Sequence, residues 1–329
     1  MFEDKKNYVS EIKICELRFA VKCNSKCKMC YLWKSVQPNE GLMTIADWKN
    51  FIDQLAGLYG HNIRVNFSGS GEVLMREGIE DILRHSCRKF SLSLNTNGYL
   101  VDQSVAHILA QTLDAIGISL DGAVAETHDY LRGIPGAYEK AVSAINYLRN
   151  ESPNMIITVN TIISDKNLDE ILDLVEWVDS RQINGIIFQA LTIPSNAKND
   201  RFWYKNDFAF LWPKDQKKIS EVIDELIYRK RRGSKVVNSV AQLDYFKSYF
   251  LHPEMAGEGL RCEVERVLKV EPNGDIKICD FSEPIGNVTK ELLDKILTSE
   301  TADLERRKAY QCRKPCHILI NCFHEQEDE

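Results

Sequence analysis

Residues 13–31 read KICELRFAVKCNSKCKMCY, a β-type run that leads directly into Cys23, Cys27 and Cys30. In α/β folds built on parallel strands, the loops that follow the strands carry the chemistry. Three thiolates in such a loop can bind one iron–sulfur cluster and leave one iron open. Structural zinc normally takes four ligands, and no further Cys or His lies beside these three. The loop therefore favours an iron–sulfur cluster, with zinc bound through a distant fourth ligand as the alternative.

The alternation of elements after this loop decides the fold class. Short β-rich runs alternate with amphipathic helical patterns, which is typical of repeated βα units and a parallel sheet. The expected strands are residues 13–21, 63–67, 92–95, 115–120, 156–162 and 185–190, with helices near 102–111, 137–149 and 168–179. Thr44 is expected to cap a further helix between the first two strands. Six βα units predict an α/β fold, a partial (β/α)6 TIM-like barrel.

The regular pattern ends after Leu191, which predicts three parts: a barrel over residues 1–195, linker helices and an aromatic loop over 196–255, and a small Cys-rich α+β cluster domain over 256–329. The linker helices are expected near residues 216–230 and 240–250. In the last part, a Pro-Asn-Gly turn at 272–274 predicts a hairpin of residues 264–270 and 275–278. Cys279 then follows the second strand of the hairpin.

The charge, the apolar segments and the cysteine content indicate which partners and which compartment to expect. The 329 residues carry a net charge of −6, which disfavours broad contact with nucleic acid phosphates. The first residues lack the apolar core of a signal peptide, and no apolar run is long enough to cross a bilayer, so we expect a cytoplasmic protein without a membrane partner. Thiols stay reduced in that compartment, so the ten cysteines point to metal binding or catalysis rather than to disulfides.

The first cysteine loop resembles the CxxxCxxC motif of the radical S-adenosylmethionine (SAM) superfamily, in which an aromatic residue follows, here Tyr31. The resemblance spans residues 12–191. After the second strand, Gly69, Gly71 and Glu72 are similar to the superfamily's glycine-and-glutamate motif. The resemblance implies that the glycines let the backbone approach the methionyl part of SAM, and that Glu72 accepts its ammonium group.

Further matches follow in order at the ends of the later strands. The resemblance implies that Ser119 and Arg132 contact SAM, with Arg132 gripping its carboxylate, and that Asn160 reaches the ribose. It places the adenine near the last strand of the barrel. The remaining expected cofactor-binding residues are Asn95, Asn97, Gln189 and Leu191. His128 is expected to brace the following helix rather than to act in catalysis.

The superfamily resemblance implies the chemistry and its cofactors. A [4Fe–4S] cluster on Cys23, Cys27 and Cys30 would bind SAM through its open iron and cleave it to a 5′-deoxyadenosyl radical. That radical abstracts hydrogen from a substrate C–H bond, so the barrel would have to hold the substrate close and exclude water. We therefore expect an oxidoreductase-type enzyme whose partner is an electron donor such as flavodoxin or ferredoxin. A non-catalytic iron–sulfur or zinc protein is the alternative from another class.

The C-terminal cysteines resemble the SPASM and Twitch extensions of the superfamily, which bind auxiliary clusters. One auxiliary [4Fe–4S] cluster is expected on Cys262, Cys279, Cys312 and Cys316, with Cys322 either replacing one of these ligands or left free. A tail stabilised by zinc is the alternative. A free Cys322 would be a candidate catalytic residue, because its thiol could return hydrogen to a substrate radical.

The substrate is expected to be a peptide or protein side chain that is modified oxidatively, because relatives of this shape act on such groups. Dehydrogenation or epimerisation of a sugar or aminocyclitol is the alternative for a small-molecule substrate. The few residues before the first strand are expected to leave no leader-binding domain, which weakens the peptide interpretation without excluding it. Oxidation is favoured over epimerisation, since Cys322 lies only six residues beyond Cys316.

Overall fold

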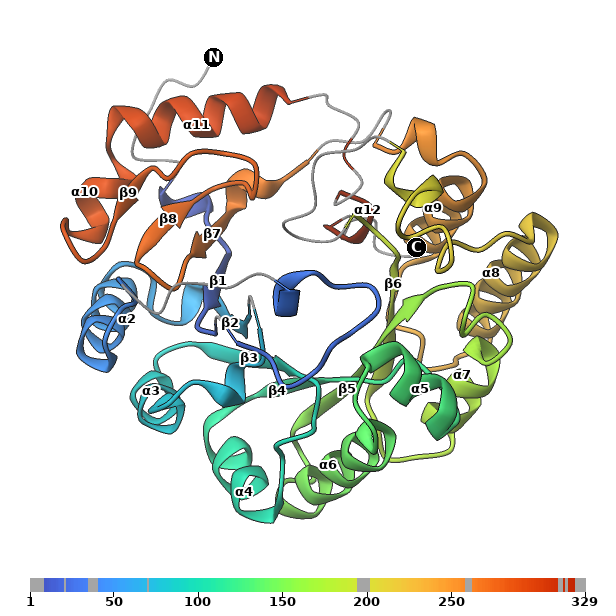
Figure 1. The fold of residues 1–329 in the computed structure, drawn as a ribbon. Helices are drawn as coiled ribbons and strands as arrows, with labels where there is room; N and C mark the ends of the chain where they lie inside the picture. Colours follow the sequence, from blue (N-terminus) through green and yellow to red (C-terminus); the bar gives the residue numbers. More distant parts are fainter. Residues whose placement is uncertain are drawn as a thin grey trace.

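The computed structural model describes residues 9–20, 22–34, 41–69, 71–193, 202–257, 262–312, 316 and 319–322. Its strands form an open sheet in the order β6-β5-β4-β3-β2-β1-β7-β8-β9, which curves around a central space (Figure 1). The strands are β1 Ile14–Arg18, β2 Arg64–Ser68, β3 Ser91–Thr96, β4 Ala115–Ser119, β5 Ile156–Ile163, β6 Gly185–Ala190, β7 Val267–Val270, β8 Asp275–Lys277 and β9 Gly286–Asn287. The expected α/β partial barrel with a parallel sheet is confirmed.

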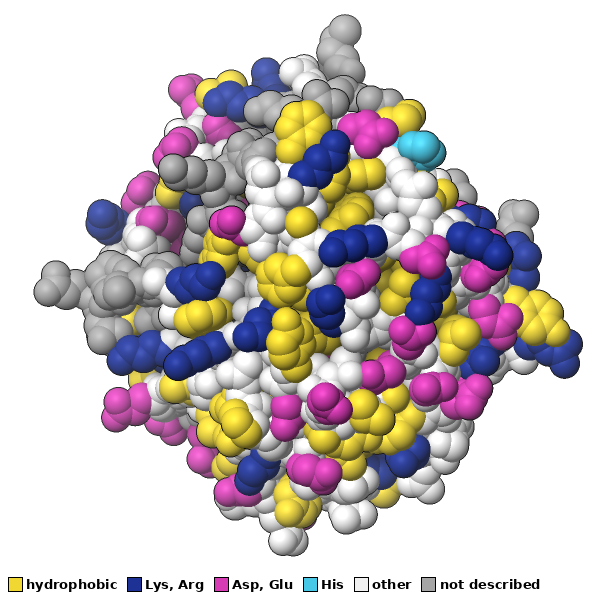
Figure 2. Space-filling view, turned by 45° about the vertical axis from the view of Figure 1, so that its right-hand side comes forward, with side chains coloured by type: hydrophobic (Ala, Val, Ile, Leu, Met, Phe, Trp, Pro, Cys, Tyr) yellow, Lys and Arg dark blue, Asp and Glu magenta, His cyan; other side chains and the backbone are white. Residues whose placement is uncertain are grey.

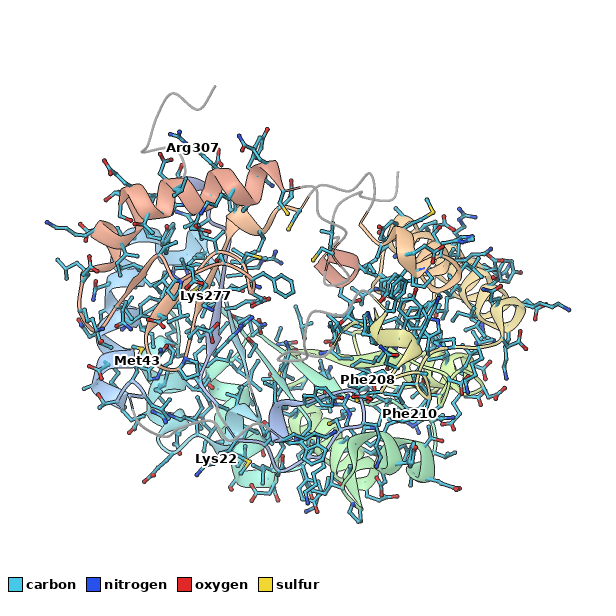
Figure 3. The ribbon with its side chains drawn as sticks, turned by 45° about the horizontal axis from the view of Figure 1, so that its top comes forward. Lys22, Met43, Phe208, Phe210, Lys277 and Arg307 are labelled. Carbon is cyan, nitrogen blue, oxygen red and sulfur yellow. The ribbon has the colours of Figure 1, made fainter. Side chains whose placement is uncertain are left out.

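The helices pack around the curved sheet, most of them on its outer face, while α12 lies beside β6 (Figure 1). They are α2 Ile45–Tyr59, α3 Ile79–Ser86, α4 Gln103–Thr112, α5 Ala125–Arg132, α6 Ala137–Glu151, α7 Ile171–Asp179, α8 Gln216–Arg231, α9 Val240–Leu251, α10 Leu293–Leu297, α11 Glu300–Gln311 and α12 Leu319–Cys322. Thr44 caps α2 as predicted, because its side chain accepts from Asp47 N while Asp47 accepts from Thr44 N. Figure 3 places Arg307 on the side of α11 that faces away from the sheet.

The strands alternate between a buried outer face and a polar inner face. In β2 and β3, Val65, Phe67, Leu92 and Leu94 are fully or almost fully buried against the helices. The residues between them point into the central space and are only partly buried or exposed. This period-2 pattern is what a sheet covered by helices on one face requires. The sheet therefore leaves its inner face free for a site.

The C-terminal hairpin continues the barrel sheet. β7 pairs in parallel with β1, with Leu17 opposite Val270, and β8 then pairs antiparallel with β7. Two predicted bounds were too wide, because β1 ends at Arg18 and the segment Val264–Arg266 forms a 3-10 turn before β7. Within the described residues, no helix has both the length and the apolar character needed to cross a membrane.

Candidate active site

The loop after β1 carries Cys23, Cys27 and Cys30, and the end of α5 holds it in place. Lys26 N donates to the Arg132 carbonyl at 3.0 Å, and Lys28 N donates to the Leu131 carbonyl at 2.8 Å. Gly133, in the left-handed region at φ 64°, follows α5, and a Cβ there would overlap the Lys26 carbonyl. A glycine is therefore required where the helix end meets the cysteine loop.

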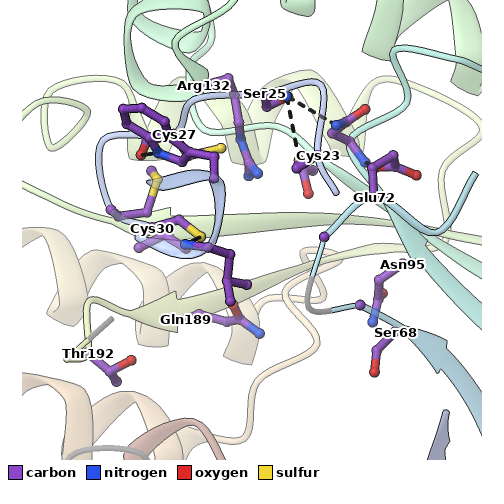
Figure 4. Close-up of a pocket in the computed structure, with 18 of the residues that line it drawn as sticks. Cys23, Ser25, Cys27, Cys30, Ser68, Glu72, Asn95, Arg132, Gln189 and Thr192 are labelled. Atoms are coloured by element: carbon purple, nitrogen blue, oxygen red, sulfur yellow. Dashed lines mark hydrogen bonds between the residues drawn. The ribbon is translucent and has the colours of Figure 1, made fainter. Parts of the chain in front are cut away.

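The three thiols lie close enough to influence one another electrostatically. Cys23 Sγ accepts from Ser25 N and Cys30 Sγ accepts from Leu32 N, each at 3.4 Å (Figure 4). Burial raises the pKa of all three thiols, and that of Cys27 rises to about 11. Because metal ligands are thiolates, loading this site must release protons.

A buried ion pair stands beside the thiols. Arg132 Nε lies 2.7 Å from Asp121 Oδ2, whose side chain is fully buried. Burial opposes the charge on Arg132, but Asp121 and the neighbouring Cys27 outweigh it and hold the pKa of the guanidinium above its usual value. Figure 4 shows Arg132 next to Cys27. The guanidinium lines the cavity described below, so a cation is available to an anionic group bound there.

His128 supports the Asp121 segment from behind. Its Nδ1 accepts from Asp121 N at 2.9 Å, and the ring is fully buried. Burial, aided by the nearby Arg132 charge, lowers the pKa of His128 to about 3. A neutral ring that bonds to backbone fits the expected structural role of this histidine.

Glu72 is buried at 3% exposure in the loop after β2. Its carboxylate accepts from Leu74 N at 3.2 Å, from Thr96 Oγ1 at 2.7 Å and from Asn97 N at 2.9 Å. Burial raises its pKa. A carboxylate offers about four acceptor positions, so three protein donors leave room for one more. Glu72 therefore joins the ends of β2 and β3 and still has capacity for the ammonium group expected of SAM.

The two glycines before Glu72 let the loop after β2 pack closely on itself and on the cysteine loop. A Cβ on Gly71 would overlap the carbonyl of Lys22, and Glu72 N donates to the same carbonyl at 2.9 Å. A Cβ on Gly69 would overlap the Gly71 carbonyl. The loop after β2 thus lies directly against the cysteine loop, which only glycine permits here.

These groups surround a cavity of about 410 Å³ at the carboxyl ends of the strands. The expected site residues that line it are Cys23, Cys27, Cys30, Gly69, Gly71, Glu72, Asn95, Asn97, Ser119, Arg132, Gln189 and Leu191. Two expected cofactor-binding residues do not line it. Asn160 donates from Nδ2 to Asn95 Oδ1 at 3.0 Å, and Tyr31 donates to Asp207 while its ring packs on Phe208.

The cavity also contains residues that sequence reasoning missed. One of them is Ser25, whose Oγ accepts from Nδ2 of the expected residue Asn97 at 3.0 Å and so joins the cysteine loop to the end of β3. Ser25 lies inside the cysteine motif, so its position could have identified it. Asn321 also lines the cavity, but its partner Ala190 is 131 residues away and no local signal marks it.

Three of the C-terminal cysteines lie near one another. Cys262 interacts electrostatically with Cys279 and Cys316, and burial raises its pKa to about 11. Cys312 follows α11 as its C-terminal cap residue. Cys322 ends α12, and its side chain lies outside the described residues.

The donor set of the N-terminal loop fits a cluster better than a single ion. Among the described residues, no three His, Cys, Asp or Glu side chains converge closely enough to hold one metal ion. Three thiols around one open cavity match a [4Fe–4S] cluster, because each thiolate then binds a different iron. The site therefore fits this group together with a small polar ligand on the open iron.

Comparison with known proteins gives a family and several relatives. The Radical SAM superfamily profile matches residues 17–178. An AdoMet-dependent heme synthase of Methanosarcina barkeri is 31% identical over 180 residues, which covers 54% of this chain and 50% of the relative. The subtilosin biosynthesis protein AlbA of Bacillus subtilis is 29% identical over 160 residues, covering 48% of this chain and 34% of the relative. The chain thus spans at most about half the length of these curated relatives.

Solved structures share the fold over almost the whole chain. anSMEcpe with bound AdoMet and Cp18Cys peptide superposes with a TM-score of 0.67 at 18% identity, covering 96% of this chain and 91% of the other. SuiB of Streptococcus suis, bound to its precursor peptide SuiA, gives 0.68 at 16% identity, covering 96% and 72%. At this identity the likeness concerns the fold alone.

Proposed function

We propose that this chain, which belongs to the radical SAM superfamily through residues 17–178, modifies a peptide or protein side chain oxidatively. The superfamily uses a [4Fe–4S] cluster and SAM, and this chain is a radical SAM enzyme. When bound, the cluster supplies one electron for the cleavage of SAM to a 5′-deoxyadenosyl radical. The observation that carries the proposal is the cavity in which three thiols meet Glu72 and Arg132.

The chain's own residues have distinct roles in this proposal. Cys23, Cys27 and Cys30 hold the cluster. Arg132 faces the cofactor's carboxylate and Glu72 its ammonium group, so the amino acid part of SAM lies between opposite charges. The expected roles of the other cofactor-binding residues remain proposals, and those of Asn160 and Tyr31 would be indirect, through Asn95 and Asp207.

The inner face of the sheet favours a peptide as substrate. Many of its side chains are amides or hydroxyls, although the same face also carries Glu16, Arg18, Ile162 and Ile187. The amides and hydroxyls are Asn66, Ser68, Ser93, Asn95, Ser119, Asn160 and Gln189. The buried Oδ1 of Asn160 accepts no hydrogen bond from any residue that the structure describes. Such a surface suits a substrate with many amide donors and acceptors, whereas a flat apolar macrocycle needs apolar walls. The names of AlbA, anSMEcpe and SuiB, which refer to a bacteriocin or to bound peptides, support the same class.

We also propose one auxiliary [4Fe–4S] cluster on Cys262, Cys279, Cys312 and Cys316. Its support is the proximity of Cys262 to Cys279 and Cys316. Zinc is the alternative occupant, since four thiolates suit both. The division into residues 1–195, 196–255 and 256–329 remains part of the proposal, as does an electron donor of the flavodoxin or ferredoxin kind.

Anaerobic incubation tests the activity. Reconstituted protein with SAM and dithionite should release 5′-deoxyadenosine, and a mixed-sequence peptide library should increase the release and yield peptides lighter by two hydrogens. Fe-coproporphyrin III serves as the comparison compound, because one relative is named its synthase and another is named a heme synthase. Stimulation by the porphyrin alone would contradict the peptide proposal, and no 5′-deoxyadenosine under any condition would contradict SAM cleavage itself.

The fate of the substrate radical is a separate question. We propose oxidation, in which the substrate radical would lose a proton to solvent and an electron to the auxiliary cluster, rather than return of hydrogen from Cys322. Running the reaction in D2O distinguishes the two outcomes. Solvent deuterium on the reacting carbon, lost in Cys322→Ala, would establish Cys322 as a hydrogen donor and overturn this preference.

A further inference from the structure

The outer edge of β6 is the free edge of the parallel sheet, and its backbone groups need partners. At a sheet edge, every second residue presents its N–H and C=O outward. In β6 these residues are Ile186, Phe188 and Ala190. Ile186 N donates to the Lys235 carbonyl and Val237 N donates to the Ile186 carbonyl, both at 2.9 Å. A short extended segment after α8 therefore satisfies the first of the three.

Two asparagine side chains continue this pairing where the backbone partner ends. Asn238 Oδ1 accepts from Phe188 N at 2.7 Å, and its Nδ2 donates to the Phe188 carbonyl at 2.8 Å. Asn321 does the same for Ala190, accepting from its N and donating to its carbonyl, both at 2.8 Å. Each side-chain amide thus makes the two hydrogen bonds that the backbone of a neighbouring strand would make.

The second amide comes from a distant part of the chain. Asn321 lies in α12, which packs beside β6 (Figures 1 and 3). It follows Cys316, a proposed auxiliary ligand, by five positions. The backbone that it holds is the cavity wall, because Gln189, Ala190 and the residues up to Ile193 line the cavity.

The two hydrogen bonds from Asn321 go to a buried residue, so their loss should cost stability at the cavity wall. Ala190 is buried at 1% exposure, so removal of the amide leaves a buried N–H and a buried C=O unpaired. The next carbonyl, of Leu191, is held by Tyr249 Oη at 2.9 Å. Side chains from beyond residue 195 thus hold the whole end of β6.

We propose that Asn321 is a positioning residue that fixes the cavity wall and makes the affinity for SAM depend on the C-terminal cysteine segment. This inference rests on the proposed function, because it takes the cavity to be the SAM site. Through its two bonds to Ala190, Asn321 couples the C-terminal cysteine segment to residues 189–193 of the cavity wall. The C-terminal segment then acts on the cofactor site as well as on electron transfer.

The test compares Asn321→Ala with Asn184→Ala in reconstituted full-length protein. Asn184 also bonds to the sheet through its side-chain amide, but at the amino end of β6, since its Oδ1 accepts from Ile157 N at 2.8 Å. Three quantities are measured: the Kd for SAM by equilibrium dialysis, the melting temperature, and the deuterium uptake of the peptide covering residues 186–193. The deuterium uptake is measured in the protein both before and after reconstitution.

Asn321→Ala should raise the Kd for SAM about ten-fold, the effect of losing one or two net hydrogen bonds, and should increase deuterium uptake at residues 186–193. Asn184→Ala should change only the melting temperature. Cys316→Ala should also raise the Kd, and its effect should not add to that of Asn321→Ala if both act through the same contact. An unchanged Kd in Asn321→Ala, in a protein whose wild type binds SAM, would overturn the inference alone. Absence of SAM binding in the wild type would instead overturn the proposed function.

Discussion

The two cysteine sites are built in different ways. The N-terminal site draws Cys23, Cys27 and Cys30 from one short loop that backbone bonds tie to the end of α5. The C-terminal site draws Cys262, Cys279 and Cys316 from segments that lie far apart in the sequence. The first can form once one loop meets one helix end, whereas the second requires the hairpin, α11 and the chain beyond it to be in place. The first site is therefore preorganised by its surroundings, and the second depends on assembly of the fold.

The largest expected effect is the loss of SAM cleavage together with half of the bound iron when the N-terminal cysteines are replaced. Wild-type protein should hold about eight irons per chain, four for each [4Fe–4S] cluster. Replacing Cys23, Cys27 and Cys30 together with Ala should abolish SAM cleavage and leave about four. The measurements are iron content and release of 5′-deoxyadenosine. Retained cleavage in the triple variant would remove this loop from the catalytic site.

The reciprocal variant addresses the C-terminal site. Cys262→Ala combined with Cys279→Ala should lose about four irons and keep the cluster of the N-terminal loop. Cys87→Ala is the matched control, because Cys87 bonds to the Gln111 carbonyl outside both sites. Iron content and the electron paramagnetic resonance spectrum of the reduced protein check the result. Loss of all iron from the double variant would mean that the sites are not independent.

If the N-terminal site is preorganised, the ion pair beside its thiols should stabilise the folded protein even without metal. Arg132→Ala leaves the fully buried Asp121 without its cation, which should cost about 3–5 kcal/mol of unfolding free energy. Urea denaturation of the metal-free protein measures the loss. Adding Asp121→Asn to Arg132→Ala should recover part of it, because the unpaired buried charge is then gone. Equal stability of the single and double variants would show that the ion pair is not the cause.

A pair of glycine substitutions tests the contact between the loops after β1 and β2. Gly71→Ala would place a methyl group on the Lys22 carbonyl and should cost about 1–3 kcal/mol of stability. Gly57→Ala is the control, since Gly57 lies in the last turn of α2 and a Cβ there meets no atom within 4 Å. It should be neutral or stabilise by up to about 1 kcal/mol. Similar effects of both changes would argue against the close approach.

The same contrast explains how much the sequence could predict. The fold class and the residues of the N-terminal cavity follow from local patterns, because Cys23 and Glu72 each lie just beyond a strand whose period-2 pattern is readable. Asn321 could not be predicted, since its function depends on a partner 131 residues away. The place of β7 beside β1 was missed for the same reason. Local patterns define elements and strand-end loops, whereas pairing between distant segments is decided by tertiary packing.

The smallest expected effect is a change in the pH dependence of stability, and it concerns His128. This ring accepts a hydrogen bond from Asp121 N beside the N-terminal site. Among the described residues, no buried histidine plays this part at the C-terminal cysteines. Its pKa is lowered from 6.5 to about 3 in the folded protein, so the unfolded chain takes up a proton that the folded chain refuses. The contribution of His128 to the unfolding free energy of the metal-free protein should be fully present above pH 6.5. It should fall as the pH drops toward 3, by up to about 1.4 kcal/mol per pH unit. His128→Asn keeps an acceptor for Asp121 N and does not titrate. Urea denaturation at several pH values between 5 and 7.5 should therefore give a shallower pH dependence for this variant than for the wild type, while carboxylates contribute equally to both. Parallel pH profiles would mean that the imidazole is protonated in the fold and that the Asp121 segment is held in another way.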